Sequence, residues 1–202
     1  GGEGGGAAPA GHPPPPPPAR PRVLVPGAGL ARLALDLNAA GFRVEANEHS
    51  FFMLLASAFI LNGGLTPAAP ALIHPWALSP SNRLADGDQF RGVAVPDADP
   101  GALASGGGPG GLAMVAGEFT AVYGRAATTG GSGGSGGSGG AGGAPPPSTF
   151  DAVATAFFLD TAPNPLAYID AIASCLAPGG LWVNCGPLLW HWAGGEDDGC
   201  GG

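Results

Sequence analysis

The chain has 202 residues, of which 39 are glycine and 23 are proline, a share typical of chains that contain low-complexity segments. There are 15 acidic residues and only 7 basic ones, every one of them arginine, so the formal net charge is −8. Because no basic stripe is available to neutralise phosphates, the composition argues against a nucleic-acid-binding protein.

The apolar and cysteine content excludes two further classes. The longest apolar run, residues 51–61, is too short to cross a bilayer, so we expect no membrane span. Cys175 and Cys185 fall in segments predicted to be buried, and Cys200 lies in a glycine-rich tail. This spacing fits neither a disulfide framework nor a zinc site, which favours a reducing, intracellular protein without a metal.

Three segments have the composition of unfolded chain. We expect residues 1–21 to form a disordered Gly/Pro leader, residues 124–148 a flexible Gly/Ser/Pro insertion, and residues 194–202 a disordered tail. A low-complexity insertion inside a domain costs little, because loop-closure entropy grows only logarithmically with length. The sequence therefore predicts one domain in two parts, residues 22–123 and 149–193.

The first part alternates strands with helices. Residues 22–26 predict a strand, Gly27–Gly29 a tight turn, and the apolar spacing of residues 30–37 a helix. Residues 42–47 predict a second strand, and Ser50 is the expected cap of a helix through Asn62, whose side chains from Phe51 to Phe59 we assign to the core. This alternation is typical of a parallel sheet.

Residues 63–111 read as irregular. A third strand is expected at Arg91–Val95, followed by a compact turn at Pro96–Pro100.

The second part repeats the pattern. Residues 150–159 predict a strand covered on both faces, residues 164–176 a helix, and residues 181–185 another buried strand after the stop at Pro178–Gly180. The fold class is therefore α/β, with a doubly wound, mostly parallel sheet. A complete domain of this kind needs more strands, so we expect a sheet truncated at its C-terminal side.

The glycine turn and Glu48 suggest a nucleoside site. Backbone N–H groups of such a turn approach a ligand closely, and an acidic residue after the second strand can accept both ribose hydroxyls. The dinucleotide fingerprint needs a third glycine at position 32, which is arginine, so a nucleoside without pyrophosphate fits better than a nicotinamide dinucleotide. The alternatives are that Gly27 and Gly29 only shape a turn and that Glu48 is a solvated carboxylate.

Several motifs resemble the carnosine N-methyltransferase family. They lie at residues 23–34, 47–54, 81–83, 96–100, 116–119, 157–162 and 186–191. The resemblance implies a Rossmann-like class I methyltransferase fold and S-adenosyl-L-methionine as the cofactor. It also implies methylation of the histidine imidazole of carnosine, or of a related histidine-containing dipeptide, to give anserine.

The resemblance also implies positions for the cofactor. Carried over by position, Gly27 lines the methionine end beside Gly29, Glu48 holds the ribose, Glu118 and Phe119 flank the adenine, and Ala156 supplies a backbone contact. Relatives usually carry Asp at position 118 and Cys at position 156. The longer Glu keeps the carboxylate but moves it by about one methylene.

Asp160 and His191 resemble the family's substrate residues. A neutral imidazole attacks through one ring nitrogen while the other carries the proton, so a carboxylate that accepts this N–H fixes the reactive tautomer. We expect Asp160 in that role and His191 to orient the substrate. The alternatives are that Asp160 is a helix cap and that His191 is packed against Trp190 and Trp192.

The remaining expectations concern the other histidines, the partners and the location. His12, His49 and His74 have no partner at metal spacing, so we assign them structural or surface roles. The family resemblance implies a small-molecule substrate, a homodimer and a cytoplasmic protein that can also be nuclear. The family's N-terminal helical region and its C-terminal tyrosines are not visible here, which keeps open a catalytically incomplete cofactor-binding fragment or an interaction module.

Overall fold

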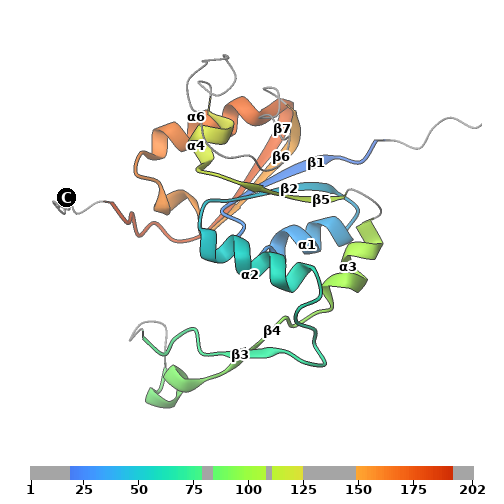
Figure 1. Ribbon diagram of the computed structural model, residues 1–202. Coiled ribbons are helices and arrows are strands. Elements are labelled where there is room, and N and C mark those ends of the chain that lie inside the picture. Colours follow the sequence, from blue (N-terminus) through green and yellow to red (C-terminus); the bar gives the residue numbers. More distant parts are fainter. Residues whose placement is uncertain (1–18, 79–83, 108–110, 125–148, 193–202) are drawn as a thin grey trace, which may run out of the picture.

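The computed structural model describes residues 19–78, 84–107, 111–124 and 149–192. The expected leader, insertion and tail lie almost wholly outside these residues, as do Cys200, His12 and the motif at residues 81–83. The two predicted parts of the domain contribute strands to one sheet (Figure 1).

The centre of the molecule is a five-stranded sheet in the order β5-β2-β1-β6-β7, and every pair in it is parallel. Its strands are β1 (Arg22–Pro26), β2 (Arg43–Glu48), β5 (Leu112–Ala116), β6 (Phe150–Ala156) and β7 (Leu176–Cys185). The chain order reverses at β1, which has β2 on one side and β6 on the other. Such a reversal is where doubly wound sheets form their ligand sites.

Helices cover both faces of the sheet (Figure 1). On one face lie α1 (Arg32–Ala39), α2 (Phe51–Leu61) and α3 (Pro100–Gly107), and on the other lie α4 (Phe119–Tyr123) and α6 (Pro165–Cys175). The predicted α/β class with a doubly wound parallel sheet is confirmed.

The central strand β1 supplies both halves of the core. Leu24 packs in a cluster with residues of α4, α6 and β6, whereas Val23 and Val25 pack on the opposite face with α1 and β2. Successive side chains of a strand point to opposite faces, so a strand buried on both sides must be apolar throughout. This is why residues 22–26 lack the polar alternation of a half-exposed strand.

Two helices begin at capping side chains, of which Ser50 was predicted as a cap. The Ser50 hydroxyl accepts the Met53 N–H at 3.5 Å, and the Asn164 side chain accepts the N–H groups of Leu166 and Ala167 at 3.1 and 3.3 Å. These bonds satisfy backbone donors that have no partner within the helix. The predicted helices at residues 50–62 and 164–176 are confirmed.

The strand predicted at residues 91–95 forms over its last three residues, outside the main sheet. Residues 93–95 do form a strand, β4 (Val93–Val95), but it pairs antiparallel with β3 (Ala71–Ile73) outside the main sheet. We call β3, β4 and the short 3₁₀ helix η1 (Asp86–Phe90) between them the arm, because they project away from the body of the molecule (Figure 1). The third strand of the main sheet is β5, which was not predicted, and the expected turn at residues 96–100 leads into α3.

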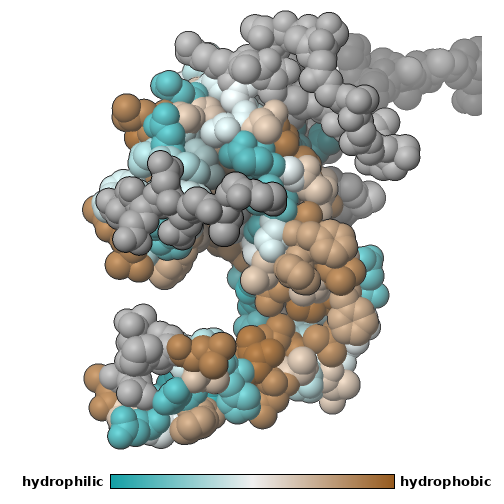
Figure 2. All heavy atoms as spheres, turned by 60° about the vertical axis from the view of Figure 1, so that its left-hand side comes forward, coloured by the Kyte–Doolittle hydropathy of each residue, from teal (hydrophilic) through white to brown (hydrophobic). Residues whose placement is uncertain are grey.

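The apolar face of α2 is largely exposed, contrary to the prediction that it belongs to the core. Phe51, Phe52, Leu55 and Phe59 are 71%, 80%, 60% and 56% exposed, whereas Ser57 and Ile60 are buried. Figure 2 shows hydrophobic surface along the inner side of the notch between the body and the arm. The helix contacts the body through one narrow stripe, so most of its rings face outward.

Three further expectations were wrong. The strand predicted at residues 181–185 forms as part of β7, but it is mostly exposed and not buried. The strand predicted at residues 150–159 ends at Ala156, since Phe157 has a positive φ of 53° and points into solvent. Cys185, at the end of β7, is exposed, while Cys175 is buried, and burial raises the pKa of the Cys175 thiol to about 11. In the described part of the chain, no helix is both long and apolar enough to cross a membrane.

Candidate functional site

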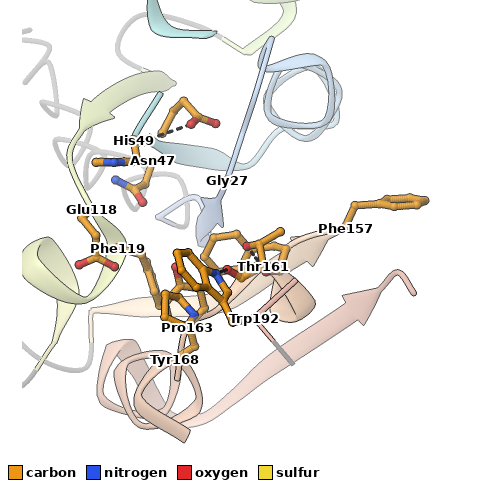
Figure 3. Close-up of a pocket in the computed structure, with 12 residues that line it drawn as sticks. Gly27, Asn47, His49, Glu118, Phe119, Phe157, Thr161, Pro163, Tyr168 and Trp192 are labelled. Atoms are coloured by element: carbon orange, nitrogen blue, oxygen red, sulfur yellow. Dashed lines mark hydrogen bonds between the residues drawn. The ribbon is translucent and has the colours of Figure 1, made fainter. Parts of the chain in front are cut away.

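A cavity of about 430 Å³ opens at the carboxyl ends of β1, β2, β5 and β6 (Figure 3). Its walls are Gly27, Asn47, Glu48, His49, Glu118, Phe119, Phe157, Phe158, Thr161, Pro163, Tyr168 and Trp192. This is the edge at which parallel α/β sheets bind ligands, and the volume lies in the range of small-molecule and cofactor pockets.

The glycine turn forms the floor of the cavity next to β1. Gly27 and Gly29 have φ of +63° and +56°, values that L side chains rarely adopt. A Cβ atom on Gly27 would lie 2.5 Å from Cδ2 of Phe158, whereas one on Gly29 would meet nothing within 4 Å. The turn needs glycine at both positions for its backbone, and at Gly27 also because an aromatic ring packs directly on it.

Glu48 binds this turn and is not a solvated carboxylate. Its Oε2 accepts the Gly29 N–H at 2.8 Å, and its Oε1 accepts the N–H groups of His49 and Ser50 at 2.8 Å each. A carboxylate has about four acceptor sites. Three are used by the backbone, which leaves one on Oε2 for a ligand hydroxyl.

Glu118 follows β5 and caps α4. Its Oε2 accepts the Thr120 hydroxyl and the Ala121 N–H, both at 2.7 Å. Partial burial opposes ionisation of this carboxyl, but these hydrogen bonds outweigh it and hold the pKa of Glu118 below its ordinary value, with a small contribution from nearby His49. An ionised acceptor therefore stands at the wall of the cavity.

Aromatic rings form the side of the cavity below the glycine turn. Phe158 stacks on Tyr168 with ring centroids 4.9 Å apart, and Phe119 meets both rings edge-on at 5.4 and 5.3 Å. Burial, with the charge of Glu118, raises the pKa of Tyr168 above its ordinary value, so this phenol stays neutral. The cavity thus has two different sides. One carries two carboxylates and an amide, and the other consists of aromatic rings.

Asp160 and His191 lie next to the cavity but are not among the residues that line it. Asp160 is 2% exposed, and its Oδ2 accepts the Leu189 N–H at 3.2 Å and lies 4.0 Å from Nε2 of His191. Asp160 lies in the 3₁₀ turn η2 (Leu159–Thr161), and the cap of α6 is Asn164, so Asp160 is not a helix cap. The His191 side chain is 54% exposed and is not packed away.

Half of the residues predicted to bind the cofactor or the substrate line this cavity. Gly27, Glu48, Glu118 and Phe119 line the cavity, while Gly29, Ala156, Asp160 and His191 do not. Gly29 is connected to the cavity through the hydrogen bond from its N–H to Glu48. Ala156 is the last residue of β6 and directly precedes Phe157, which lines the cavity.

Sequence reasoning missed Asn47, His49, Thr161, Tyr168 and Trp192 as lining residues. Asn47 and His49 flank Glu48 at the end of β2, so their position after a strand was a usable signal. His49, assigned to the surface, is exposed but belongs to the cavity wall. Tyr168 reaches the cavity from α6, and no pattern within that helix indicates this.

Arg32, which replaces the third glycine of the dinucleotide fingerprint, does not line the cavity. Its guanidinium binds the carboxylate of Asp97, with Nε 2.8 Å from Oδ1 and NH2 3.2 Å from Oδ2, and it also pairs with Asp36. These bonds raise the pKa of Arg32 and join α1 to the segment after β4. Among the described residues, no group of three or more His, Cys, Asp or Glu is arranged to hold a metal ion.

Comparison with known proteins identifies the family. The family model of carnosine N-methyltransferase matches residues 13–199. The chain belongs to the carnosine N-methyltransferase family. The motifs at the glycine turn, at Glu48 and around Asp160 lie within the matched region.

Individual members of the carnosine N-methyltransferase family are longer than this chain. It is 41% identical over 170 residues to the carnosine N-methyltransferase of Schizosaccharomyces pombe and 38% identical over 173 residues to that of Rattus norvegicus. These matches cover 84% and 86% of this chain but only 40% and 37% of the relatives. The chain therefore spans about two fifths of their length.

Solved structures of methyltransferases resemble the fold only distantly. The glycopeptide N-methyltransferase MtfA complexed with sinefungin has a TM-score of 0.44 at 15% identity, covering 83% of this chain and 47% of that one. The arsenic(III) S-adenosylmethionine methyltransferase of Chlamydomonas reinhardtii has a TM-score of 0.42 at 17% identity, covering 80% and 38%.

Proposed function

We propose that this chain forms the cofactor-binding part of an S-adenosyl-L-methionine-dependent N-methyltransferase. Its acceptor is the histidine imidazole of carnosine or a related histidine-containing dipeptide, and its product is anserine or the corresponding methylated dipeptide. The observation that supports the proposal most directly combines the family of the chain with the position of its cavity. A chain of the carnosine N-methyltransferase family has its cavity where β1, β2 and β5 end, lined by Gly27, Glu48 and Glu118.

The residues present fit an adenosine-bearing cofactor. The free acceptor site on Glu48 suits a ribose hydroxyl, and the carboxylate of Glu118 suits an amino group of a base. The rings of Phe119 and Phe158 offer apolar contact to a flat base. The bare Gly27 backbone allows close approach of a ligand chain.

The cofactor supplies an electrophilic methyl group on a sulfonium. An imidazole nitrogen of the acceptor would take this methyl group, and the electron pair of the carbon–sulfur bond would stay on sulfur. The ring would then carry a positive charge, which Asp160 would stabilise, until its other nitrogen gives up a proton. Positioning and a water-poor site suffice for this transfer, and no covalent enzyme intermediate is needed.

Asp160 and His191 would act on the acceptor ring. A buried carboxylate that accepts the ring N–H selects the tautomer whose other nitrogen is free, and it stabilises the cationic product. For Asp160 to bind a ligand, its carboxylate needs to accept another hydrogen bond beside that from the Leu189 N–H to Oδ2. The exposed His191 side chain can turn toward the same ligand.

The first test is calorimetric titration with S-adenosylhomocysteine, using the 202-residue chain and the variants Glu48→Gln and Asp170→Asn. Glu48→Gln places an amide against backbone N–H donors at the turn, so we expect at least a tenfold loss of affinity. Asp170→Asn makes the same change on the exposed surface of α6 and should leave affinity unchanged. Absence of binding to the wild-type chain, or tighter binding of NAD, would contradict the proposal.

A second candidate is a cofactor-binding unit without turnover. The observation that favours it is that Asp160 and His191 lie outside the residues that line the cavity, in a chain that spans two fifths of its relatives. Transfer of labelled methyl groups to carnosine by the 202-residue chain supports the enzyme. Binding of S-adenosylhomocysteine without such transfer supports the binding unit.

We also propose a homodimer and a cytoplasmic location that extends to the nucleus. Both come from the family resemblance and stay predictions. Light scattering of the purified chain after size exclusion tests the first, and microscopy of the tagged protein in cells tests the second.

A further inference from the structure

We call the part of the cavity lined by Thr161, Pro163 and Trp192 its aromatic end, and the proposed function gives this end no role. Asp160 and His191 are assigned to the acceptor, yet neither lines the cavity, whereas their sequence neighbours Thr161 and Trp192 do. Trp192 lies beside Thr161 and Pro163 in Figure 3, on the side opposite His49 and Asn47. The indole therefore lines the cavity, while the Asp160–His191 pair that precedes Thr161 and Trp192 in the sequence does not.

The indole of Trp192 is held in place although it is 65% exposed. Its Nε1 donates to the carbonyl oxygen of Thr161 at 3.1 Å. The preceding backbone is fastened to the same turn, because the His191 N–H donates to the Asp160 carbonyl at 3.0 Å and the Leu189 N–H to the Asp160 carboxylate. Three hydrogen bonds thus fix an exposed aromatic face at the rim of the cavity.

A second hollow lies on the other side of this indole. It has a volume of about 140 Å³ and is lined by Ala162, Pro163, Pro165, Trp190 and Trp192. Trp192 and Pro163 border both cavities. The backbone of Trp190 has φ of +45°, a conformation that bulky residues rarely adopt and that is found where the surrounding structure imposes it.

The chemistry of this end suits a flat ring that gains positive charge. Most of its described wall is tryptophan and proline, with Thr161 and Ala162 beside them, and the face of an indole attracts a cation more strongly than that of any other side chain. The carboxylate of Asp160 is bonded to the same segment, through the Leu189 N–H. A neutral imidazole would stack here, and its methylated cation would bind more tightly still.

We infer that Trp192 determines acceptor specificity, by stacking on the imidazole at the aromatic end of the cavity, while the hollow lined by Trp190 and Pro165 takes the remainder of the acceptor. This inference rests on the proposed function and names a residue and a subsite for it. Asp160 then has two roles. It holds the backbone that carries Trp192, and it accepts the N–H of the acceptor imidazole as proposed above.

The test measures acceptor binding apart from catalysis. Carnosine and anserine are titrated calorimetrically into the 202-residue chain saturated with S-adenosylhomocysteine, for wild type, Trp192→Leu, Trp192→Phe and Trp76→Leu. Trp192→Leu should lower carnosine affinity at least fivefold, and it should lower anserine affinity more when the titration is run at a pH that keeps the methylated ring protonated. Trp192→Phe, which keeps an aromatic face but not the N–H, should recover affinity to within threefold of wild type.

Controls separate this inference from the proposed function. Trp76 lies on the arm, so Trp76→Leu should bind carnosine and S-adenosylhomocysteine within twofold of wild type, and each Trp192 variant is titrated with carnosine at a concentration of S-adenosylhomocysteine that saturates that variant. Unchanged carnosine affinity in Trp192→Leu overturns the inference. Binding of S-adenosylhomocysteine without carnosine by the wild-type chain also overturns it, while failure to bind S-adenosylhomocysteine overturns the proposed function and the inference with it.

Discussion

Gly27 and Gly29 have nearly the same backbone conformation but different surroundings. Replacing either with alanine places a Cβ in the left-handed region, at a cost of about 1 kcal/mol. At Gly27 the new methyl group also meets the Phe158 ring at 2.5 Å. We therefore expect Gly27→Ala to lower the free energy of unfolding by about 1–3 kcal/mol more than Gly29→Ala, measured by urea denaturation.

A double-mutant cycle separates backbone strain from ring contact. In a Phe158→Ala background, the difference between Gly27→Ala and Gly29→Ala should vanish, because the ring that meets the methyl group is gone. If Gly27→Ala stays the more costly change in that background, the contact with Phe158 is not its cause.

Glu48 shows why residue types alone did not define its role. An acid after the second strand was predicted to hold a ribose by both hydroxyls, but three of its acceptor sites bind the backbone N–H groups of Gly29, His49 and Ser50. The carboxylate therefore shapes the turn first and has one site left for a ligand. A nearby glycine turn supplies donors that compete with the ligand, and these appear only when the chain is folded.

At the scale of elements, the short helix α4 depends on the charge of its cap. The pKa of Glu118 is lower in the folded chain than its ordinary value of 4.5, so ionisation favours folding. The stabilisation is complete above the unfolded-state pKa and is lost as pH falls through the lowered folded-state pKa. We expect the unfolding free energy of wild type relative to Glu118→Gln to be constant near neutral pH and to decline below about pH 4.5.

Urea denaturation across pH measures this difference. Thr120→Val is the matched control, because it removes one hydrogen bond to the carboxylate and keeps the charge. It should move the decline toward higher pH without abolishing it. A difference between wild type and Glu118→Gln that stays level down to pH 3 would show that the cap is not ionised at neutral pH.

The elements that the sequence predicted are those with local signals. The β1 turn, the helix capped by Ser50 and the helix capped by Asn164 each begin at residues whose side chains or backbone act within a few positions. β5 was missed because its five residues follow a glycine-rich stretch and have no alternation to mark them. Its identity as a strand comes from pairing with β2, a contact between distant residues.

Burial was harder to predict than secondary structure. The apolar residues of α2 predicted a core helix, yet which of its rings are covered depends on what the rest of the molecule places against them. The same limit applies to the site, because Tyr168 and Trp192 reach the cavity from α6 and the segment after β7. Composition states how much apolar surface a helix has but not what packs on it.

At the scale of the whole molecule, the exposed face of α2 is an apolar surface feature of the described residues. Phe51, Phe52, Leu55 and Phe59 leave a contiguous apolar area on one helix, and such areas promote association. We expect Phe52→Ser to change the free energy of unfolding by less than about 0.5 kcal/mol, since the ring is 80% exposed. It should lower the binding of a hydrophobic dye and reduce concentration-dependent light scattering.

Ile60 on the same helix gives the opposite expectation. It is 8% exposed, so Ile60→Ala should cost about 2–4 kcal/mol of unfolding free energy. A large loss of stability in Phe52→Ser would mean that this face is covered when the chain is in solution.

The order of strands in the sheet has a consequence for synthesis on the ribosome. β1 pairs with β2, which follows it within a few tens of residues, and with β6, which follows much later. The Arg22 N–H, for example, donates to the carboxylate of Asp151, which lies 129 positions further along the chain. The nascent chain can complete one side of its central strand long before the other side exists. Until residues 150–156 emerge, the apolar strand β1 lacks its second neighbour. Such late pairing is slow and is typical of sheets built from segments that lie far apart in the sequence.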